Sequence, residues 1–184
     1  MPLTPEVLAA NGEVVAWLGN LDVSFARDEE SWFTIDGVDS PPQICSDASG
    51  GAFVLLPPHN VLYVSSEGRA GIIAESFEAF VQLVVACPYW LDILKFSAGG
   101  DLAEMRRAAE ALETTLDDED EINEAREEIH RALDLPAAND PVGAFYEAVA
   151  ASDAIVRATD GSPFTTLFNR FSIDNNPMLR NAAA

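Results

Sequence analysis

Hydrophobic residues in the first half of the chain fall into short runs separated by turn residues, a pattern typical of β-strands. The runs expected to form strands are 31–35, 43–46, 52–56, 61–65 and 71–74. Two of them flank Pro57-Pro58 without containing a proline, so we expect them to form a hairpin. A helix from Thr4-Pro5 to about Leu18 is expected before the strands, and a helix capped by Ser76 after them.

Beyond Gly100 the apolar residues recur at helical spacing. Asp101 is expected to cap one helix, and Asp140-Pro141 to begin another that ends near Gly161. A last short helix is expected after Ser162-Pro163. The tail from Ser172 is expected to be loose, although Ile173, Met178 and Leu179 could dock. The predicted fold class is α+β, with a small, mostly antiparallel sheet, helices packed on one side, and an all-helical C-terminal extension. We expect residues 1–98 to form the core and residues 99–184 to pack on it.

The net charge limits the classes of partner that the chain can attract. The 184 residues include 31 acidic and 10 basic side chains, for a formal net charge of −21. This charge disfavours nucleic acid and anionic membrane surfaces and favours a basic protein partner. No apolar run reaches the length of a membrane span, and Met1–Pro5 lack the basic start of a signal peptide. We therefore expect a cytoplasmic protein.

Negative charge is densest between Asp117 and Glu128, where eight acids accompany one base. A calcium-binding EF-hand loop is disfavoured, because the run has no glycine for the sharp turn and continues into a predicted helix. On a helix, these carboxylates would form a ridge that could enter the basic groove of a nuclease. The alternative is a helix whose charges only keep it soluble.

Two further places could contribute to binding. Glu67 and Arg69 lie in a short turn between two predicted strands, where they could pair with each other or project toward a partner. Trp90 and other aromatic residues could line a groove or fill the core, and only their exposure decides between these roles. A hydrolase that uses Glu67 as an acid or base is the least favoured alternative.

Motifs for cofactor chemistry are missing from the sequence. It contains no phosphate-binding or dinucleotide-binding glycine loop, no nucleophile elbow and no zinc-protease helix. The two cysteines and two histidines, which are Cys45, Cys87, His59 and His130, have no metal-ligand spacing. We expect no catalytic residue, no cofactor and no metal, and we expect both cysteines to be buried and reduced.

One ordered set of motifs resembles a known family. Asp47–Gly51 enter a strand, Ser66-Glu67-Gly68 make a turn, Ile73-Ala74 lead into a Ser-capped helix, and Pro88-Tyr89-Trp90 follow it. In this order and spacing they resemble the SUKH superfamily, which includes Syd-like proteins and relatives of the yeast cell-wall glucan synthesis regulator. The resemblance implies an α+β sheet with helices on one side and no catalytic residues. Many members look like immunity proteins that neutralise toxins, nucleases among them, and others look like regulatory modules.

The sequence therefore predicts a non-enzymatic, acidic protein-binding module, of which an immunity protein against a basic, nuclease-type toxin is one form. The residues expected to bind the partner are Glu67, Arg69, Asp117, Asp118, Glu119, Asp120, Glu121, Glu124 and Trp90. The alternative is a self-associating regulatory or structural protein whose C-terminal helices form a homodimer interface.

Overall fold

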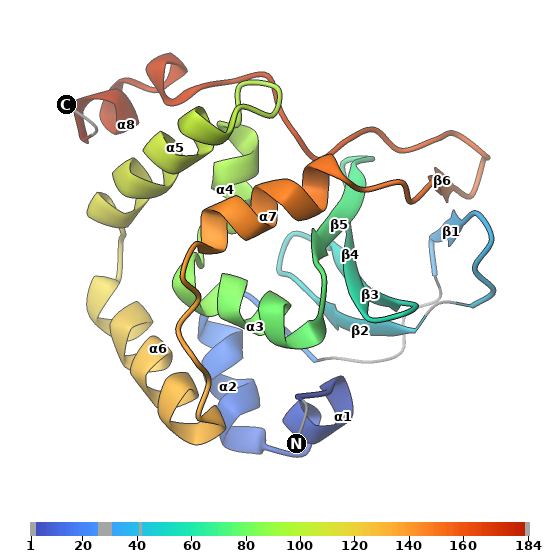
Figure 1. Ribbon diagram of the computed structural model, residues 1–184, viewed down its shortest axis with the longest axis horizontal. Coiled ribbons are helices and arrows are strands. Elements are labelled where there is room, and N and C mark those ends of the chain that lie inside the picture. The colour runs from blue at the N-terminus through green and yellow to red at the C-terminus, as the bar shows by residue number, and fades with distance from the viewer. Residues whose placement is uncertain (1–2, 26–30, 41, 183–184) are drawn as a thin grey trace.

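The computed structural model describes residues 3–25, 31–40 and 42–182 (Figure 1). Met1 and Pro2, two of the five residues on which the expected absence of a signal peptide rests, lie outside these ranges. Within the described ranges, no helix combines the length and the apolar character needed to span a membrane.

Along the described chain, two helices precede a run of strands, a run of helices follows, and one further strand comes before the C-terminal turn and helix. These elements are α1 (Pro5–Ala9), α2 (Gly12–Asn20), β1 (Phe33–Ile35), β2 (Gln43–Ser46), β3 (Ala52–Leu56), β4 (Asn60–Val64), β5 (Ala70–Ala74), α3 (Phe77–Ala86), α4 (Trp90–Lys95), α5 (Leu102–Thr114), α6 (Glu119–Leu133), α7 (Pro141–Ala150), β6 (Val156–Ala158), the 3-10 turn η1 (Ile173–Asn175) and α8 (Pro177–Ala182). The predicted α+β class is confirmed, with antiparallel sheets and a largely helical C-terminal region.

The main sheet has the strand order β2-β3-β4-β5, and every neighbouring pair is antiparallel. Side chains alternate between its two faces. Phe53 and Tyr63 pack against the helices, whereas Val54 and Leu62 belong to a second cluster on the other face. Both faces are therefore buried, which explains why β3 and β4 read as continuous apolar runs rather than as alternating ones.

A two-stranded ribbon covers the second face. β1 pairs antiparallel with β6, and Phe33, Ile35 and Val156 pack with the side chains of β3 and β4. The predicted helix from Asp140 to Gly161 is thus wrong in its second half, since α7 ends at Ala150 and the chain continues as a strand. An extended Val156 buries its side chain under the sheet, and this tertiary contact overrides helical spacing.

The segment after Ser162-Pro163 is extended, so the short helix predicted there is also wrong. Thr165 bridges to Arg69 in a parallel sense, and the Ala70 N–H donates to the Thr165 carbonyl at 2.9 Å. These bonds continue the edge of the main sheet beyond β5. Gly161, the expected helix end, instead lies in the turn after β6 with φ of +87°.

The predicted helix starts are confirmed at four positions. Thr4, Ser76, Asp101 and Asp140 each accept a hydrogen bond from a backbone N–H in the first turn of their helices. The predicted helix from Thr4 to Leu18 is instead divided in two. Asn11 caps the second part by accepting from the Val14 N–H at 3.3 Å.

The C-terminal tail docks on the body rather than hanging loose. Ile173 and Leu179 are buried with Phe96, Ala108 and Ala111 in a small cluster between α8 and α5. The capping box at Ser172, with Asn175, begins the 3-10 turn that directs Ile173 inward.

The largest hydrophobic cluster crosses the expected boundary at residue 98. Trp90 and Ile93 of α4 share it with Met105 of α5 and Phe145 of α7. Figure 1 shows α7 and α3 side by side over the helical face of the sheet, with α2, α6 and α5 forming an outer arc. Whether residues 1–98 constitute a separate domain stays a prediction.

Candidate functional site

The acidic run predicted from the sequence forms the outer side of α6. Ala125 and Ile129 are buried against the body of the protein, where α6 packs on α2. The exposed acids on and before this helix, here called the α6 acidic face, are Asp117, Asp118, Glu119, Asp120, Glu121, Glu124 and Glu127. Three of them, Asp120, Glu124 and Glu127, follow the spacing that places side chains on one side of a helix.

The single base of this run points away from the acidic face. The Arg126 guanidinium donates to the carbonyls of Val85 and Ala86 at 2.9 and 3.0 Å and pairs with Glu113 of α5. It thereby joins α6 to the C-terminal end of α3, where a positive charge is favourable. Among described residues, no basic side chain lies within ion-pair distance of the α6 acidic face.

The helix dipole stabilises some of the carboxylates of the α6 acidic face. Glu119, Asp120 and Glu121 lie in the first turn of α6, where carboxylates are stabilised by the positive end of the helix. Glu124 and Glu127 lie beyond the first turn, and the spacing from Asp120 to Glu124 is a like-charge i, i+4 pair that is mildly destabilising. Glu127 lies four residues before Arg131, whose positive charge interacts with it favourably, so Glu124 is the central carboxylate that folding does not explain.

The contacts of Arg126 with Glu113 predict that the stability of the fold depends on pH. Hydrogen bonds from Arg126 hold the pKa of Glu113 below its ordinary value of 4.5, and a hydrogen bond from Tyr89 acts in the same direction. Since the folded-state pKa lies below that of the unfolded chain, the pair stabilises the fold above pH 4.5, and its contribution is lost as the pH falls through the folded-state pKa.

We expect Glu113→Gln to lower the free energy of unfolding at pH 7 by about 1 kcal/mol, because the Glu113 side chain is 44% exposed and solvent screens the pair. The difference from wild type should shrink as the pH falls below 4.5 in urea unfolding measured across pH. Glu110→Gln, at an exposed site on the same helix, is the control. A difference for Glu113→Gln that stays constant with pH would contradict this account.

The Glu67–Arg69 turn is distant from α6, on the opposite side of the molecule (Figure 1). Its two charged residues do not pair. Arg69 instead donates to the carbonyls of Thr166 and Phe168 at 3.2 and 3.1 Å, which fastens the extended segment beside β5. Glu67 is exposed at the tip of the turn. The residues predicted to bind a partner therefore do not form one continuous surface.

A hollow of about 310 Å³ with both polar and apolar lining lies beside this turn. Its charged lining consists of Glu67, Arg69, Asp92 and Lys95, two acids and two bases. These opposite charges balance, so the hollow lacks the negative bias of the rest of the chain.

The Asp47–Gly51 motif, which contributes to the family resemblance, has a structural role. Asp47 is buried and accepts from the N–H groups of Ser49 and Gly51 and from the Tyr63 hydroxyl at 2.6 Å. Burial, together with this bond, raises the pKa of Tyr63. A Cβ at Gly51 would lie 2.7 Å from the Asp47 carboxylate and closer still to Tyr63, so the motif requires glycine there.

Trp90 is not available to a partner, which corrects its predicted role. It is 3% exposed, and its ring packs against Phe53, Tyr63 and Phe145 in the main core. The sequence could not decide between core and surface for this residue, because the residue that covers it from α7 lies 55 positions away.

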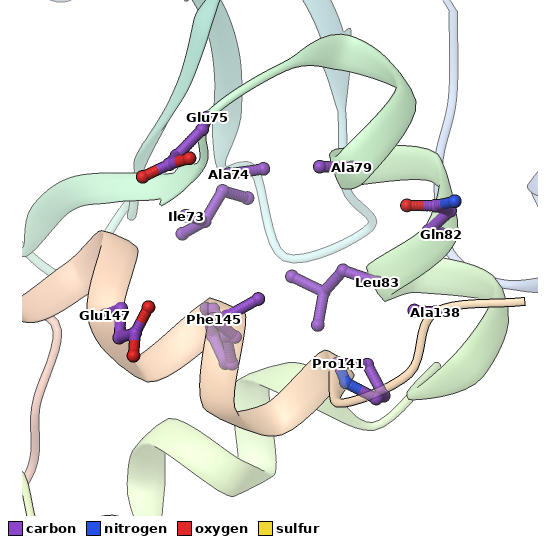
Figure 2. Close-up of a pocket in the computed structure, with 11 residues that line it drawn as sticks. Ile73, Ala74, Glu75, Ala79, Gln82, Leu83, Ala138, Pro141, Phe145 and Glu147 are labelled. Atoms are coloured by element: carbon purple, nitrogen blue, oxygen red, sulfur yellow. The ribbon is translucent and has the colours of Figure 1, made fainter.

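A pocket that the sequence did not indicate lies between α3 and α7, next to the end of β5 (Figure 2). Its apolar lining includes Ile73, Leu83 and Phe145, and its volume is about 120 Å³. Two carboxylates, Glu75 and Glu147, also line it. They are 72 residues apart in the sequence, so only the packing of α7 beside β5 reveals that they are neighbours of one pocket.

The expected burial of both cysteines is confirmed, and burial raises the pKa of Cys87 to about 11. Within the described ranges, no group of three or more histidine, cysteine, aspartate or glutamate side chains is arranged to hold a metal ion. Exposed large hydrophobic side chains there are scattered over α1, the loop before β6 and the C-terminal tail, namely Val7, Ile155, Phe171 and Met178.

The apolar side of α5, which a homodimer of the C-terminal helices would use, faces the interior and α8 in the described chain.

In comparisons with known proteins, no protein-family model, no curated protein and no solved structure matches this chain.

Proposed function

We propose that this protein is a non-enzymatic, cytoplasmic binding module that docks a basic protein partner on the α6 acidic face. The observation that carries the proposal is the orientation of Arg126. It satisfies the carbonyls at the end of α3, so within the described chain no basic side chain forms an ion pair with Glu124 or Glu127. A partner that brings lysine or arginine side chains would supply the missing charges.

The distribution of charge supports docking rather than solubility alone. The formal net charge of −21 already opposes aggregation, and the acids of α6 beyond its first turn add repulsion that the helix dipole does not offset. A long-range negative field would raise the rate of encounter with a basic groove. An immunity protein that occludes the basic active site of a nuclease-type toxin, as the SUKH resemblance implies, is one module of this kind.

A salt titration tests this function. The partner is the basic protein that co-purifies with the chain from its native cells, and its affinity is measured between 0.1 and 1 M salt. We expect the affinity to fall at least about tenfold, because the screening length contracts from about 10 Å to about 3 Å over this range. An affinity that is indifferent to ionic strength would remove the electrostatic basis of the proposal.

A further inference from the structure

We propose that the pocket between α3 and α7 receives one lysine side chain of the basic partner, and this inference rests on the function proposed above. The stem of the lysine would lie against the apolar wall, and its ammonium group would reach Glu75 and Glu147. The α6 acidic face would then steer the partner, and this pocket would select a particular side chain on it.

The wall of the pocket suits a narrow aliphatic chain. Ile73, Leu83 and Phe145 are each almost fully buried and present hydrocarbon to the hollow. A volume of about 120 Å³ is smaller than the roughly 150 Å³ that admits a benzene molecule. A lysine stem of four methylene groups fits such a space better than an aromatic ring, and it can bury its carbon atoms while the charged end stays in water.

The mouth of the pocket carries two carboxylates without partners. Glu75 follows β5 directly, Glu147 lies in α7, and both are exposed. Figure 2 shows them at the same end of the pocket, on either side of Ile73. Within the described chain, neither side chain makes a hydrogen bond or an ion pair. An arriving ammonium group would therefore meet unpaired negative charge at the end of an apolar slot.

The polar side chain at the other end of the pocket, that of Gln82, already makes a hydrogen bond within the protein. Gln82 donates to the carbonyl of Pro136 at 2.9 Å, which holds the segment before α7 against α3. Figure 2 places Gln82 away from the two glutamates, beyond Leu83. The pocket therefore has an apolar wall along most of its length and negative charge at one end only. A lysine side chain, with an aliphatic stem and a positive charge at its tip, is complementary to this arrangement.

The test uses two small probes that share a butyl chain and differ in the charge and kind of their head group. n-Butylammonium represents the lysine side chain, n-butanol is its neutral counterpart, and binding is followed by amide chemical shifts of the isotope-labelled full chain. We expect n-butylammonium to shift residues 73–83 and 138–147 and to bind about fivefold more tightly than n-butanol. Equal affinities for the two probes, or shifts centred on α6, would overturn the proposal.

Matched variants locate the effect. Glu75→Gln combined with Glu147→Gln should weaken n-butylammonium about fivefold and leave n-butanol unchanged, whereas Glu110→Gln should affect neither probe. Ala144→Leu, which fills the pocket from α7, should abolish binding of both probes, and Ala150→Leu on the same helix should not. Thermal melting verifies that each variant is folded. Retention of n-butylammonium binding by the folded Ala144→Leu variant would also overturn the proposal.

The lysine pocket and the docking function on α6 can be tested separately, so one can be wrong while the other holds. Neutralising Asp120, Glu124 and Glu127 should weaken the partner while n-butylammonium still binds the pocket within about twofold. If the partner depends on α6 and the Glu75 and Glu147 variants do not change its affinity, the lysine pocket is wrong and the docking function remains. Shifts that depend on protein concentration without any probe would instead assign the pocket to a second copy of the chain and overturn the inference.

Discussion

Neutralising the centre of the α6 acidic face, with Asp120→Asn, Glu124→Gln and Glu127→Gln together, is expected to slow association with the basic partner about tenfold at low salt. The three side chains are exposed and form no ion pair within the described chain, so their removal weakens the long-range field more than the fold. Stopped-flow mixing at 0.1 M salt measures the rate, and the dissociation rate should change much less.

A control with the same change in net charge separates a local effect from a general one. Asp39→Asn, Glu110→Gln and Asp153→Asn also remove three exposed carboxylates, but they lie outside α6. This variant should retain an association rate within about twofold of wild type. If both triple variants slow association equally, the total charge of the chain steers the partner, and α6 has no special role.

Shortening the chain to end at Ser97 is expected to abolish cooperative folding. The shortened chain loses Phe145, which covers Trp90, and Met105, which is fully buried in the same cluster. It also loses β6, the pairing partner of β1. Removing a single buried phenylalanine side chain costs about 3–5 kcal/mol, and total stabilities are about 5–15 kcal/mol, so the combined loss exceeds what the fold can tolerate.

Thermal melting with near-ultraviolet circular dichroism measures this outcome. A chain that ends at Phe171 is the control, since it loses only η1 and α8 and should still melt cooperatively, at a lower temperature. Native near-ultraviolet signals and a sharp transition in the chain that ends at Ser97 would show that residues 1–98 are an independent domain, as the change of pattern near residue 98 suggested.

Signals within a few residues were sufficient to predict much of the fold. Ser76, Asp101 and Asp140 begin their helices because each side chain satisfies a backbone N–H in the next turn, a contact that depends only on neighbouring residues. The β3–β4 hairpin was predictable for the same reason, since its two runs are adjacent and its turn contains the prolines.

Long-range pairing was not predictable from one sequence. β1 and β6 are three residues each and are separated by about 120 positions, so neither has a strong local preference. Val156 also fits a helical spacing with Val149, and only the uncovered face of the main sheet selects the strand. The same limit applies to the pocket, whose carboxylates come from separate elements.

The sequence predicted which acidic residues form the α6 acidic face, but it did not predict how the basic side chains near them are oriented. The acidic run does lie on a helix, and its charge was plain from the sequence. The direction of Arg126 was not, because it depends on the end of α3 lying beside α6. Arg69 was expected to face Glu67 or a partner and instead holds backbone carbonyls, a role that no local motif marks.

Carboxylate footprinting of the complex tests the docking of a basic partner on α6 most directly. The chain is labelled with a carbodiimide and an amine, with and without the partner, and the rate at each acid is read by mass spectrometry. We expect the partner to protect Asp120, Glu124 and Glu127, while Asp39 and Asp153 continue to react at their free rates. Equal labelling of the three α6 carboxylates in the free and bound protein would contradict the proposed function.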